Sequence, residues 1–211
     1  MNPMARTARD FIYLASQSPR RRQLLDQLGV RHQLLLAAED EDAESLEAQV
    51  PGEAPAAYCE RVTGLKLDAA LVRLSRLGLP PAPVLCADTT VALGARIFGK
   101  PADPADAAAT LRRLSGRTHR VMTAVALSAA SGRSRDVRLS VSTVRFAPLP
   151  AEMIAAYVAG GEPFGKAGAY AIQGPIAGWI ERIAGSYSGI MGLPLHETAQ
   201  LLIAAGVRFQ K

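Results

Sequence analysis

A short segment near the amino end of the chain combines hydroxyl side chains with a run of arginines. Residues 11–15 (FIYLA) predict a buried strand, and a helix is expected over 20–28, with Ser18 as N-cap and Pro19 in its first turn. Three arginines, 20–22, then stand where the helix dipole favours acids. A bound phosphate would resolve this conflict, because helix amides, a hydroxyl such as that of Ser16 and guanidinium groups all attract anions. The alternative is a capped helix with solvated arginines.

A carboxylate follows a second predicted core strand. Residues 84–87 (VLCA) are apolar, and Asp88 and Thr89 come directly after them, so we expect Asp88 at the carboxyl end of a strand. Ligands gather at such ends in α/β sheets, where a carboxylate can bind Mg²⁺ or orient a water. Judged on position alone, Asp88 could equally initiate a turn.

Two further segments place lysines among small residues. Lys100 lies in a rigid Gly-Lys-Pro turn that lacks the spacing of a Walker phosphate loop. Residues 165–174 (GKAGAYAIQG) surround Lys166 and Gln173 with glycine and alanine, which allow a ligand to approach the backbone closely. The amide of Gln173 both donates and accepts, which suits the edge of a base. A glycine-rich surface loop is the alternative.

The helices and strands that position these motifs are predicted from the periodicity of apolar residues and from the residues that end each segment. Helices alternate with strands along the chain, which predicts the α/β class. We expect Asp103 to cap one of the helices. Further helices are expected at 55–77, 104–114, 150–158 and 196–205, and further strands at 32–36, 118–128 and 135–146.

Composition narrows the class of protein. The chain has 211 residues, 49% of them hydrophobic, so it can bury a core without disulfides or metal. We expect residues 1–10 to be an extension and 11–211 a single two-lobed domain. The net charge of +5 favours anionic partners, but the 5% aromatic content is poor for a platform that stacks bases. Stable nucleic-acid binding is therefore not expected.

The cysteines, the histidines and the hydropathy argue against a disulfide-bonded protein, a histidine metal site and a membrane protein. Cys59 and Cys86 are isolated in apolar settings, which predicts reduced core thiols and a cytoplasmic protein. The three histidines show no paired spacing, so a histidine metal site is not expected. No apolar run reaches the roughly 20 residues that a membrane span needs, so no membrane partner is expected.

Taken together, the motifs resemble the Maf family of nucleoside triphosphate pyrophosphatases over almost the whole chain. The matching blocks are LASQSPRRRQLLDQLG (14–29), YCERVTGLK (58–66), CADTTVALGARIFGKP (86–101), LRRLSGRTHRVMTAVAL (111–127), GKAGAYAIQG (165–174) and GSYSGIMGLPLHET (185–198). Several blocks in one order are far more specific than any one of them.

The resemblance implies a fold and an activity. The fold is an α/β one akin to the inosine-triphosphate pyrophosphatases, with a long bent mixed sheet, flanking helices and two lobes around a cleft. The activity is hydrolysis of a nucleoside triphosphate to its monophosphate and pyrophosphate with a divalent cation, Mg²⁺ or Mn²⁺. Such enzymes clear non-standard nucleotides and are linked to cell division. The 165–174 block resembles the branch that acts on dTTP and UTP.

The resemblance also assigns roles to residues by position. Asp88 matches the family's proton acceptor, and Glu41 falls where an acid could help Asp88 to hold the metal. Arg20, Thr89 and Gln173 match positions linked to substrate choice. The residues expected to bind substrate are Ser16, Arg20, Arg21, Lys66, Thr89, Lys100, Lys166 and Gln173. Gly165 stands where the family usually has an acid.

The lysines add weight to this assignment. Only four of the 24 basic residues are lysines, and three of the four fall inside the matching blocks. This suggests that a compact ammonium is required there. Three expectations stay beside the main one: a homodimer by family analogy, a purine-directed enzyme of the same fold, and a non-enzymatic basic module that binds nucleic acid or division proteins.

Overall fold

One mixed β-sheet organises the protein in a computed structural model that describes residues 10–38, 41, 45–130, 132 and 134–209. Within these residues the sheet has seven strands in the order β2-β1-β3-β5-β6-β7, with β4 paired to β3. The strands are β1 (Ile12–Leu14), β2 (His32–Leu34), β3 (Val84–Leu93), β4 (Arg96–Phe98), β5 (Thr118–Ser128), β6 (Arg135–Phe146) and β7 (Ile180–Ala184). β1 runs parallel to β2 and β3, and the other pairs are antiparallel. The predicted α/β class with a mixed sheet is confirmed.

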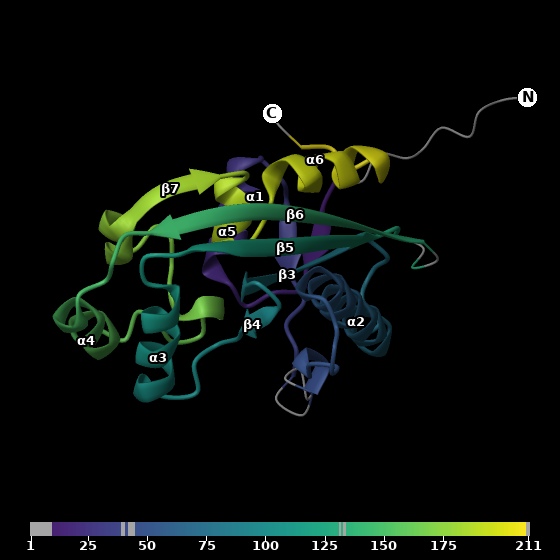
Figure 1. Cartoon of the computed structure of the whole chain (residues 1–211). Helices are drawn as coiled ribbons and strands as arrows, with labels where there is room; N and C mark the ends of the chain where they lie inside the picture. Colours follow the sequence, from purple (N-terminus) through teal and green to yellow (C-terminus); the bar gives the residue numbers. More distant parts are fainter. Residues whose placement is uncertain (1–9, 39–40, 42–44, 131, 133, 210–211) are drawn as a thin grey trace, which may run out of the picture.

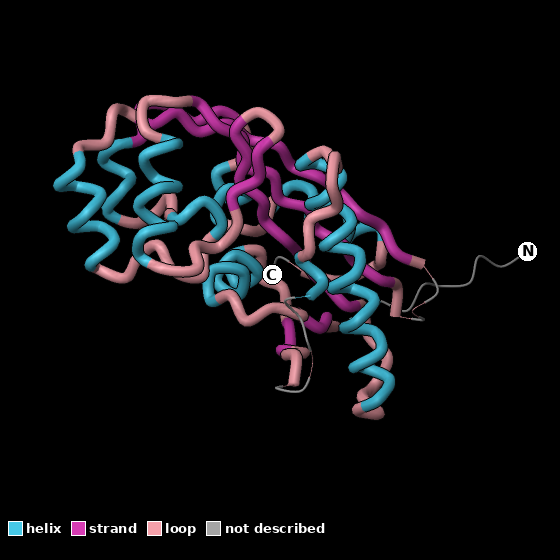
Figure 2. Tube along the Cα trace, turned by 60° about the horizontal axis from the view of Figure 1, so that its bottom comes forward, coloured by secondary structure: helices cyan, strands magenta, loops and turns pink. Residues whose placement is uncertain are grey.

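Helices cover both faces of the sheet (Figure 1). They are α1 (Pro19–Gln27), α2 (Pro55–Arg76), α3 (Pro104–Leu114), α4 (Ala151–Ala159), α5 (Tyr187–Met191) and α6 (Leu195–Ala204). Helix α2 lies on one face of the long strands, while α1, α5 and α6 lie on the other. Figure 2 shows the strands crossing between a group of helices at one end and the long α2 at the other. Short 3₁₀ turns occur at Ser45–Glu47, Ala167–Ala169 and Pro175–Trp179.

Alternation along β3 explains how one strand serves several parts of the core. Leu85 and Ala87 pack towards α1 and α6, whereas Val84 and Cys86 pack towards α2. Further along the strand, Val91 joins a third cluster with α3 and α4. Successive side chains of a strand point to opposite faces, so a single strand can hold two layers together. The third cluster lies between the sheet and the helices α3 and α4.

The edge of β3 is interrupted, and this interruption makes room for a site. On one side, β5 pairs with β3 from Leu85 to Ala92. On the other side, β1 pairs with Val84 and Leu85, and β4 pairs only from Val91 onward. The intervening residues of β3 therefore have no neighbouring strand on that side among the described parts of the chain. Asp88 and Thr89 lie in this gap, half-buried in a strand that is otherwise almost fully buried.

Most elements match the sequence predictions closely, and the differences have a tertiary cause. Helix α3 and strands β5 and β6 have the predicted bounds, and the Asp103 carboxylate caps α3 by accepting from the Asp106 amide at 2.8 Å. The prediction that Asp88 ends its strand was wrong, because pairing with β5 carries β3 on to Leu93. Strands β4 and β7 were not predicted, since each is short and has no local signal of its own.

The cysteines agree with the sequence analysis. Cys59 and Cys86 are free and buried, as expected for core thiols. Burial raises the pKa of Cys59 to about 11 and that of Cys86 to about 12, so both stay protonated at neutral pH. Within the described residues, every helix is too short or too polar to cross a bilayer.

His119 gives the fold a pH dependence. Its side chain is buried beside the rings of Phe146 and Tyr170, and Nε2 lies 2.8 Å from the Tyr170 hydroxyl. Burial lowers the pKa of His119 from 6.5 to about 4, so the unfolded chain binds a proton between these values that the folded chain does not. We expect stability to fall as pH falls through this window, by up to about 3 kcal/mol at roughly 1.4 kcal/mol per pKa unit.

Urea unfolding between pH 7 and pH 4.5 measures this effect. His119→Gln keeps a hydrogen-bonding group but does not titrate, so we expect a smaller loss of stability over the same range. An equal loss in both proteins would assign the acid sensitivity to other groups.

Candidate active site

A cavity of about 1090 Å³ opens beside the gap in β3. Its walls come from two sets of segments. One set is the start of α1, the inner side of α2, the middle of β3 and the segment after β4, and the other is residues 165–173 and 190–192. Every side chain that the sequence singled out for substrate or metal binding lines this cavity: Ser16, Arg20, Arg21, Glu41, Lys66, Asp88, Thr89, Lys100, Lys166 and Gln173.

The hydroxyl of Ser16 is set to donate into the cavity. Its Oγ accepts from the Ser18 amide and from Arg21 Nη1, each at 3.2 Å. These two bonds use both lone pairs, which leaves the hydroxyl hydrogen for a ligand. Helix α1 begins at Pro19 as predicted, but the Ser18 side chain makes no capping bond and the first turn has no acid. The amide end of α1 therefore stays open to an anion.

The segment after α5 anchors the two arginines. Arg21 Nε donates to the Gly192 carbonyl at 2.7 Å, and Arg20 Nε donates to the Met191 carbonyl at 3.4 Å. Arg21 Nη2 also lies 3.5 Å from Thr89 Oγ1. Burial lowers the pKa of Arg21, although a guanidinium stays charged at any physiological pH. Held at Nε, both guanidinium groups line the cavity, where Arg21 also donates to Ser16 Oγ through Nη1.

Lys66 joins two carboxylates at the floor of the cavity. Its Nζ donates to Asp88 Oδ1 at 2.5 Å and to Glu47 Oε1 at 2.8 Å. Burial alone would lower the pKa of Lys66, but the charge of Asp88 and the hydrogen bonds to both carboxylates outweigh it and raise the pKa. Lys66 is therefore a permanent cation, and only its ammonium nitrogen separates the two acids.

Glu47 also binds Lys100, and the sequence analysis missed it. Its carboxylate accepts from Lys100 Nζ at 2.9 and 3.2 Å. Burial alone would raise the pKa of Glu47, but the bonds from Lys66 and Lys100 lower it, so this acid is ionised. Nothing in the sequence marks Glu47 among the acids between 39 and 53, because its partners are remote in the chain.

Glu41 has a different environment from the one that its predicted role requires. Its carboxylate forms a multidentate pair with the buried Arg73 and also accepts from Arg76 at 2.9 Å. The hydrogen bond from Arg73 lowers the pKa of Glu41. Glu41 lines the cavity, but its charge is already compensated there, and its role at a metal stays a prediction.

The 165–174 segment forms the opposite wall. The Lys166 ammonium donates to the Glu162 and Phe164 carbonyls, so it braces its own loop as well as lining the cavity. Gln173 is exposed at the rim, free of the packing that holds its neighbours Ala171 and Ile172. The loop is held to β3 through Gly168, whose position leaves no room for a side chain.

Gly168→Ala tests how firmly this wall must be seated. The backbone of Gly168 has φ of +72°, and an added Cβ would lie 2.8 Å from both methyl carbons of Val91. We expect a loss of about 1–3 kcal/mol in unfolding free energy from strain and overpacking, together with weaker nucleotide binding. Gly165→Ala, with φ of +70° but open space around it, is the matched control. Equal losses in both would assign the effect to backbone strain alone.

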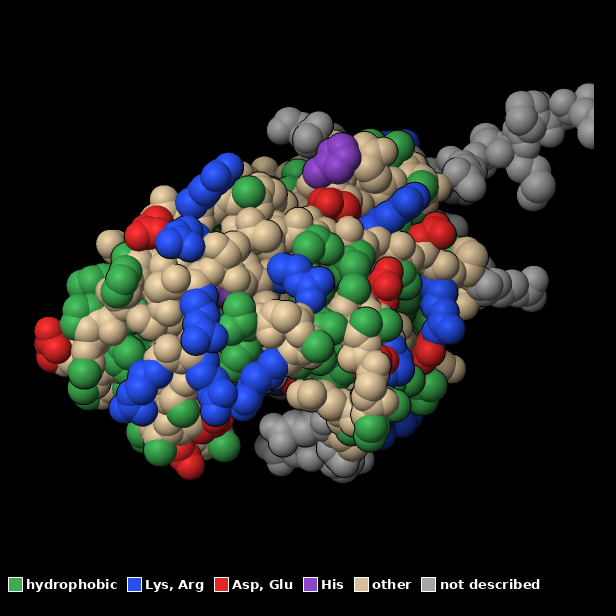
Figure 3. All heavy atoms as spheres, in the orientation of Figure 1, with side chains coloured by type: hydrophobic (Ala, Val, Ile, Leu, Met, Phe, Trp, Pro, Cys, Tyr) green, Lys and Arg blue, Asp and Glu red, His purple; other side chains and the backbone are tan. Residues whose placement is uncertain are grey.

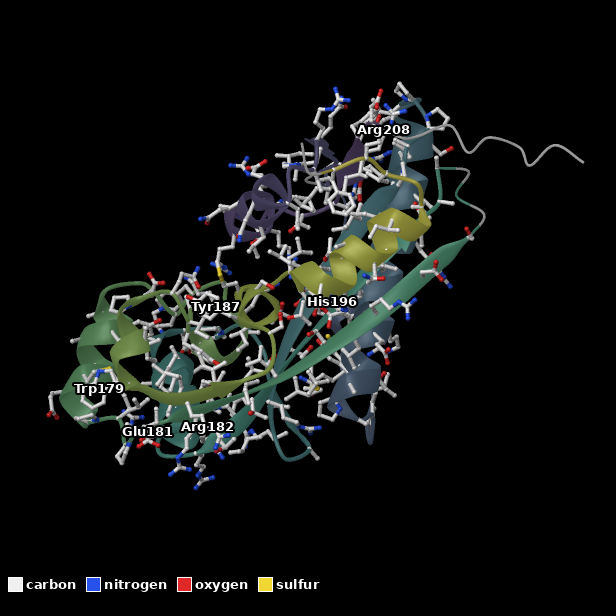
Figure 4. All side chains as sticks on the ribbon, turned by 90° about the horizontal axis from the view of Figure 1, so that it is seen from above. Trp179, Glu181, Arg182, Tyr187, His196 and Arg208 are labelled. Carbon is white, nitrogen blue, oxygen red and sulfur yellow. The ribbon has the colours of Figure 1, made fainter. Side chains whose placement is uncertain are left out.

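The cavity offers carboxylates rather than a closed metal site. The described residues contain no group of three or more His, Cys, Asp or Glu side chains able to hold a metal. His32 is on β2 and His119 on β5, with β1 and β3 between these strands in the sheet, and His196 is exposed on α6 (Figure 4). Two carboxylates, Asp88 and Glu47, nevertheless flank one point of the cavity, and Mg²⁺ commonly takes one or two protein carboxylates plus substrate phosphates.

A second hollow of about 750 Å³ lies between residues 49–56 and the β3–β4 turn. It contains one acid, Glu53, which is paired with Arg61, and one cation, Arg120, which donates to the Gly94 carbonyl. Both charged groups of this hollow are bonded to other residues of the protein. The larger cavity has many more cations and carboxylates in its lining, so we regard it as the functional one.

Comparisons with known proteins identify a family and several similar enzymes. The family model described as "Maf-like protein" matches residues 11–205. A protein named "dTTP/UTP pyrophosphatase" from Polaromonas sp. is 64% identical over 201 residues, which cover 95% of this chain and 98% of that protein. Proteins of the same name from Albidiferax ferrireducens and Burkholderia pseudomallei are also 64% identical, over 94% of this chain and 98% and 95% of their own lengths.

Among solved structures, the chain is similar to a "Nucleoside-triphosphatase / dITP/XTP pyrophosphatase" from Mycobacterium abscessus. The two share 16% identity with a TM-score of 0.42, over 66% of this chain and 75% of the other.

Proposed function

The chain belongs to the Maf family, and from this premise we propose that it hydrolyses a nucleoside triphosphate, dTTP or UTP, to the monophosphate and pyrophosphate. The observation that carries the proposal is the cavity beside β3, where four cationic side chains, Arg20, Arg21, Lys66 and Lys100, line the same cavity as Asp88. A triphosphate carries several negative charges and needs such a setting. Relatives at 64% identity that are named for this activity support the same assignment.

The chain's own residues supply positioning and charge neutralisation. The arginines of α1, the lysines and the Ser16 hydroxyl bind phosphate oxygens and align the α-phosphorus. Lys66 holds Asp88 Oδ1, so we assign proton acceptance from the attacking water to Asp88 Oδ2. Attack at the α-phosphorus breaks the bond to the bridging oxygen, and pyrophosphate leaves with that oxygen. Donors aimed at the developing charge are the largest expected contribution.

A divalent cation, Mg²⁺ or Mn²⁺, is part of this proposal. When bound, it would neutralise phosphate charge and lower the pKa of a coordinated water. Asp88 and Glu47 line the cavity and would hold it, with the cation and the phosphates taking over the bonds that Lys66 and Lys100 make to Glu47. Glu41, the acid suggested by family position, would first have to leave Arg73 and Arg76.

Base recognition is assigned to Gln173 and Thr89. A uracil or thymine edge offers acceptor, donor and acceptor groups in a row, and a side-chain amide with a hydroxyl can complement it. Both residues line the cavity, and Gln173 lies at its rim with an unburied amide. The sequence block around Gln173, which resembles the branch acting on dTTP and UTP, supports a pyrimidine.

A nucleotide panel tests the proposed function. We expect pyrophosphate release, rather than single phosphate release, from dTTP and UTP in the presence of Mg²⁺ or Mn²⁺, with weaker activity on CTP and GTP. Removal of the cation with a chelator should abolish turnover. A preference for a purine would reject the pyrimidine assignment, and release of orthophosphate would reject the bond assignment.

The non-enzymatic alternative is not favoured. Figure 3 shows several Lys and Arg side chains close together on the lower left of this face, a feature that a nucleic-acid-binding module would also need. Relatives that are 64% identical over almost the whole chain are, however, named for a nucleotide pyrophosphatase, which favours the enzyme. A link to cell division is compatible with the proposed hydrolase and would act through the nucleotide pool.

The arrangement of the strands supports a proposal about the domain organisation. We propose one two-lobed domain over residues 11–211, because β3, β5 and β6 run through both lobes. The homodimer and the cytoplasmic location stay predictions. Light scattering of the purified chain measures its oligomeric state.

A further inference from the structure

Two threonines face each other beneath the cavity. Thr89 on β3 and Thr123 on β5 are register partners, and their Oγ1 atoms lie 3.0 Å apart. Thr123 is only 1% exposed and does not line the cavity, whereas Thr89 does. Side chains directly opposite in an antiparallel pair interact, and threonines do so through a hydrogen bond. The direction of this bond decides what Thr89 offers to a ligand.

A carbonyl group sets that direction. Thr123 Oγ1 lies 2.7 Å from the Gly189 carbonyl oxygen, and at this distance one hydrogen must lie between the two oxygens. The carbonyl has none, so Thr123 donates its single hydroxyl hydrogen to Gly189. Thr123 can then only accept from Thr89, and Thr89 spends its own hydrogen on Thr123. The chain of bonds therefore runs from Thr89 through Thr123 to Gly189.

The consequence is that Thr89 can only accept hydrogen bonds at the cavity. One acceptor site faces Arg21 Nη2 at 3.5 Å. Because Thr89 lines the cavity, its other acceptor site is available to a ligand there. A hydroxyl normally both donates and accepts and so discriminates poorly. Here the buried Thr123 takes the hydrogen of the Thr89 hydroxyl, so Thr89 cannot donate to a ligand.

We propose that Thr123 is a specificity-determining residue that acts through Thr89. By fixing the Thr89 hydroxyl as an acceptor, it selects a nucleoside that presents a hydrogen-bond donor at this point of the cavity. The proposal rests on the proposed function. The donor is either the imino N3–H of uracil or thymine, which cytosine lacks because its N3 accepts, or a sugar hydroxyl.

The test removes the Thr123 hydroxyl and follows selectivity. Thr123→Val keeps the shape of the side chain but frees the Thr89 hydrogen to point at the ligand or at Arg21. We expect kcat/KM on dTTP and UTP to fall about tenfold, the effect of one hydrogen bond, and the discrimination against a nucleotide that lacks the donor group to shrink by a similar factor. Thr123→Ser retains the hydroxyl and should restore the discrimination.

Substrate analogues identify the donor. If it is the imino group, the wild-type protein discriminates against N3-methyl-UTP and Thr123→Val loses this discrimination. If it is the sugar 3′-hydroxyl, which dTTP and UTP share, the variant instead loses discrimination against the 3′-deoxynucleotide. Thr89→Val should abolish the same discrimination, and Thr123→Val should add nothing in the Thr89→Val background, as expected for two residues in one path.

Controls separate this role from a structural one. Thr198 is a buried threonine of α6 whose hydroxyl has no hydrogen-bond partner among the described residues, so Thr198→Val should leave selectivity unchanged. Wild-type selectivity in Thr123→Val, or equal damage in Thr123→Ser and Thr123→Val, would overturn the proposal. If Thr123→Val does not fold, Thr123→Ala is compared with Thr123→Ser in its place.

Failure of this proposal can be distinguished from failure of the proposed function. A wild-type chain that releases no pyrophosphate from any nucleotide rejects the function. Calorimetric binding of UTP, CTP and N3-methyl-UTP to wild type and Thr123→Val then tests the selectivity by itself.

Discussion

Asp88→Asn is expected to lower kcat by about 10²–10⁴-fold while the protein stays folded. This is the usual contribution of a positioned proton acceptor, and asparagine keeps the shape of the side chain without its basicity. Asp88 lies half-buried in the middle of β3, where pairing with β5 holds the backbone regardless of the side chain. Lys66 keeps Glu47 as a partner, so its charge stays compensated. Steady-state pyrophosphate release on dTTP measures the effect.

The metal dependence of this variant separates two roles of Asp88. If Asp88 mainly accepts the proton, saturating Mg²⁺ does not restore kcat; if it mainly holds the cation, higher Mg²⁺ restores part of it. Asp68→Asn is the matched control, since Asp68 is exposed on α2 and pairs with Arg135 away from the cavity. Near-normal turnover by Asp88→Asn would remove Asp88 from the catalytic role.

Lys66→Met is expected to lower kcat/KM by about 10²–10³-fold, the usual effect of removing one donor that stabilises developing charge. The substitution removes a cation from the triphosphate and also leaves Asp88 and Glu47 facing each other without their shared partner. Because the bond from Lys66 helps to lower the pKa of Glu47, its loss raises that pKa. We therefore expect the acidic limb of the pH–rate profile to move to higher pH.

Lys66→Arg tests whether charge alone suffices. A planar guanidinium is larger than an ammonium and has a fixed fork of donors, so it cannot occupy the point that Nζ shares between two carboxylates. We expect kcat/KM at least about tenfold below wild type despite the retained charge. Arg31→Met, at an exposed pair with Asp10, controls for loss of a surface cation. Full activity in Lys66→Arg would show that the compact ammonium is not required.

Local signals in the sequence determined most of the secondary structure. Proline in the first turn and an aspartate cap define the start of α3, and alternating apolar residues define β6; both elements have their predicted bounds. These features depend on neighbours a few residues away, which the sequence shows directly. The order of the motif blocks likewise identified the family, and every residue that it singled out lines one cavity.

Tertiary structure alone decided how those residues work together. Asp88 lies within β3 rather than at its end, because β5 pairs along the whole strand while the other edge is left open. Glu47, and not Glu41, shares Lys66 with Asp88, although both acids lie in the same stretch of sequence. Ion pairing and hydrogen-bond direction depend on distances across the fold, to which sequence separation is no guide. The sequence therefore determined which groups are present, and the packing of β3 against β5 and α2 decided which of them meet.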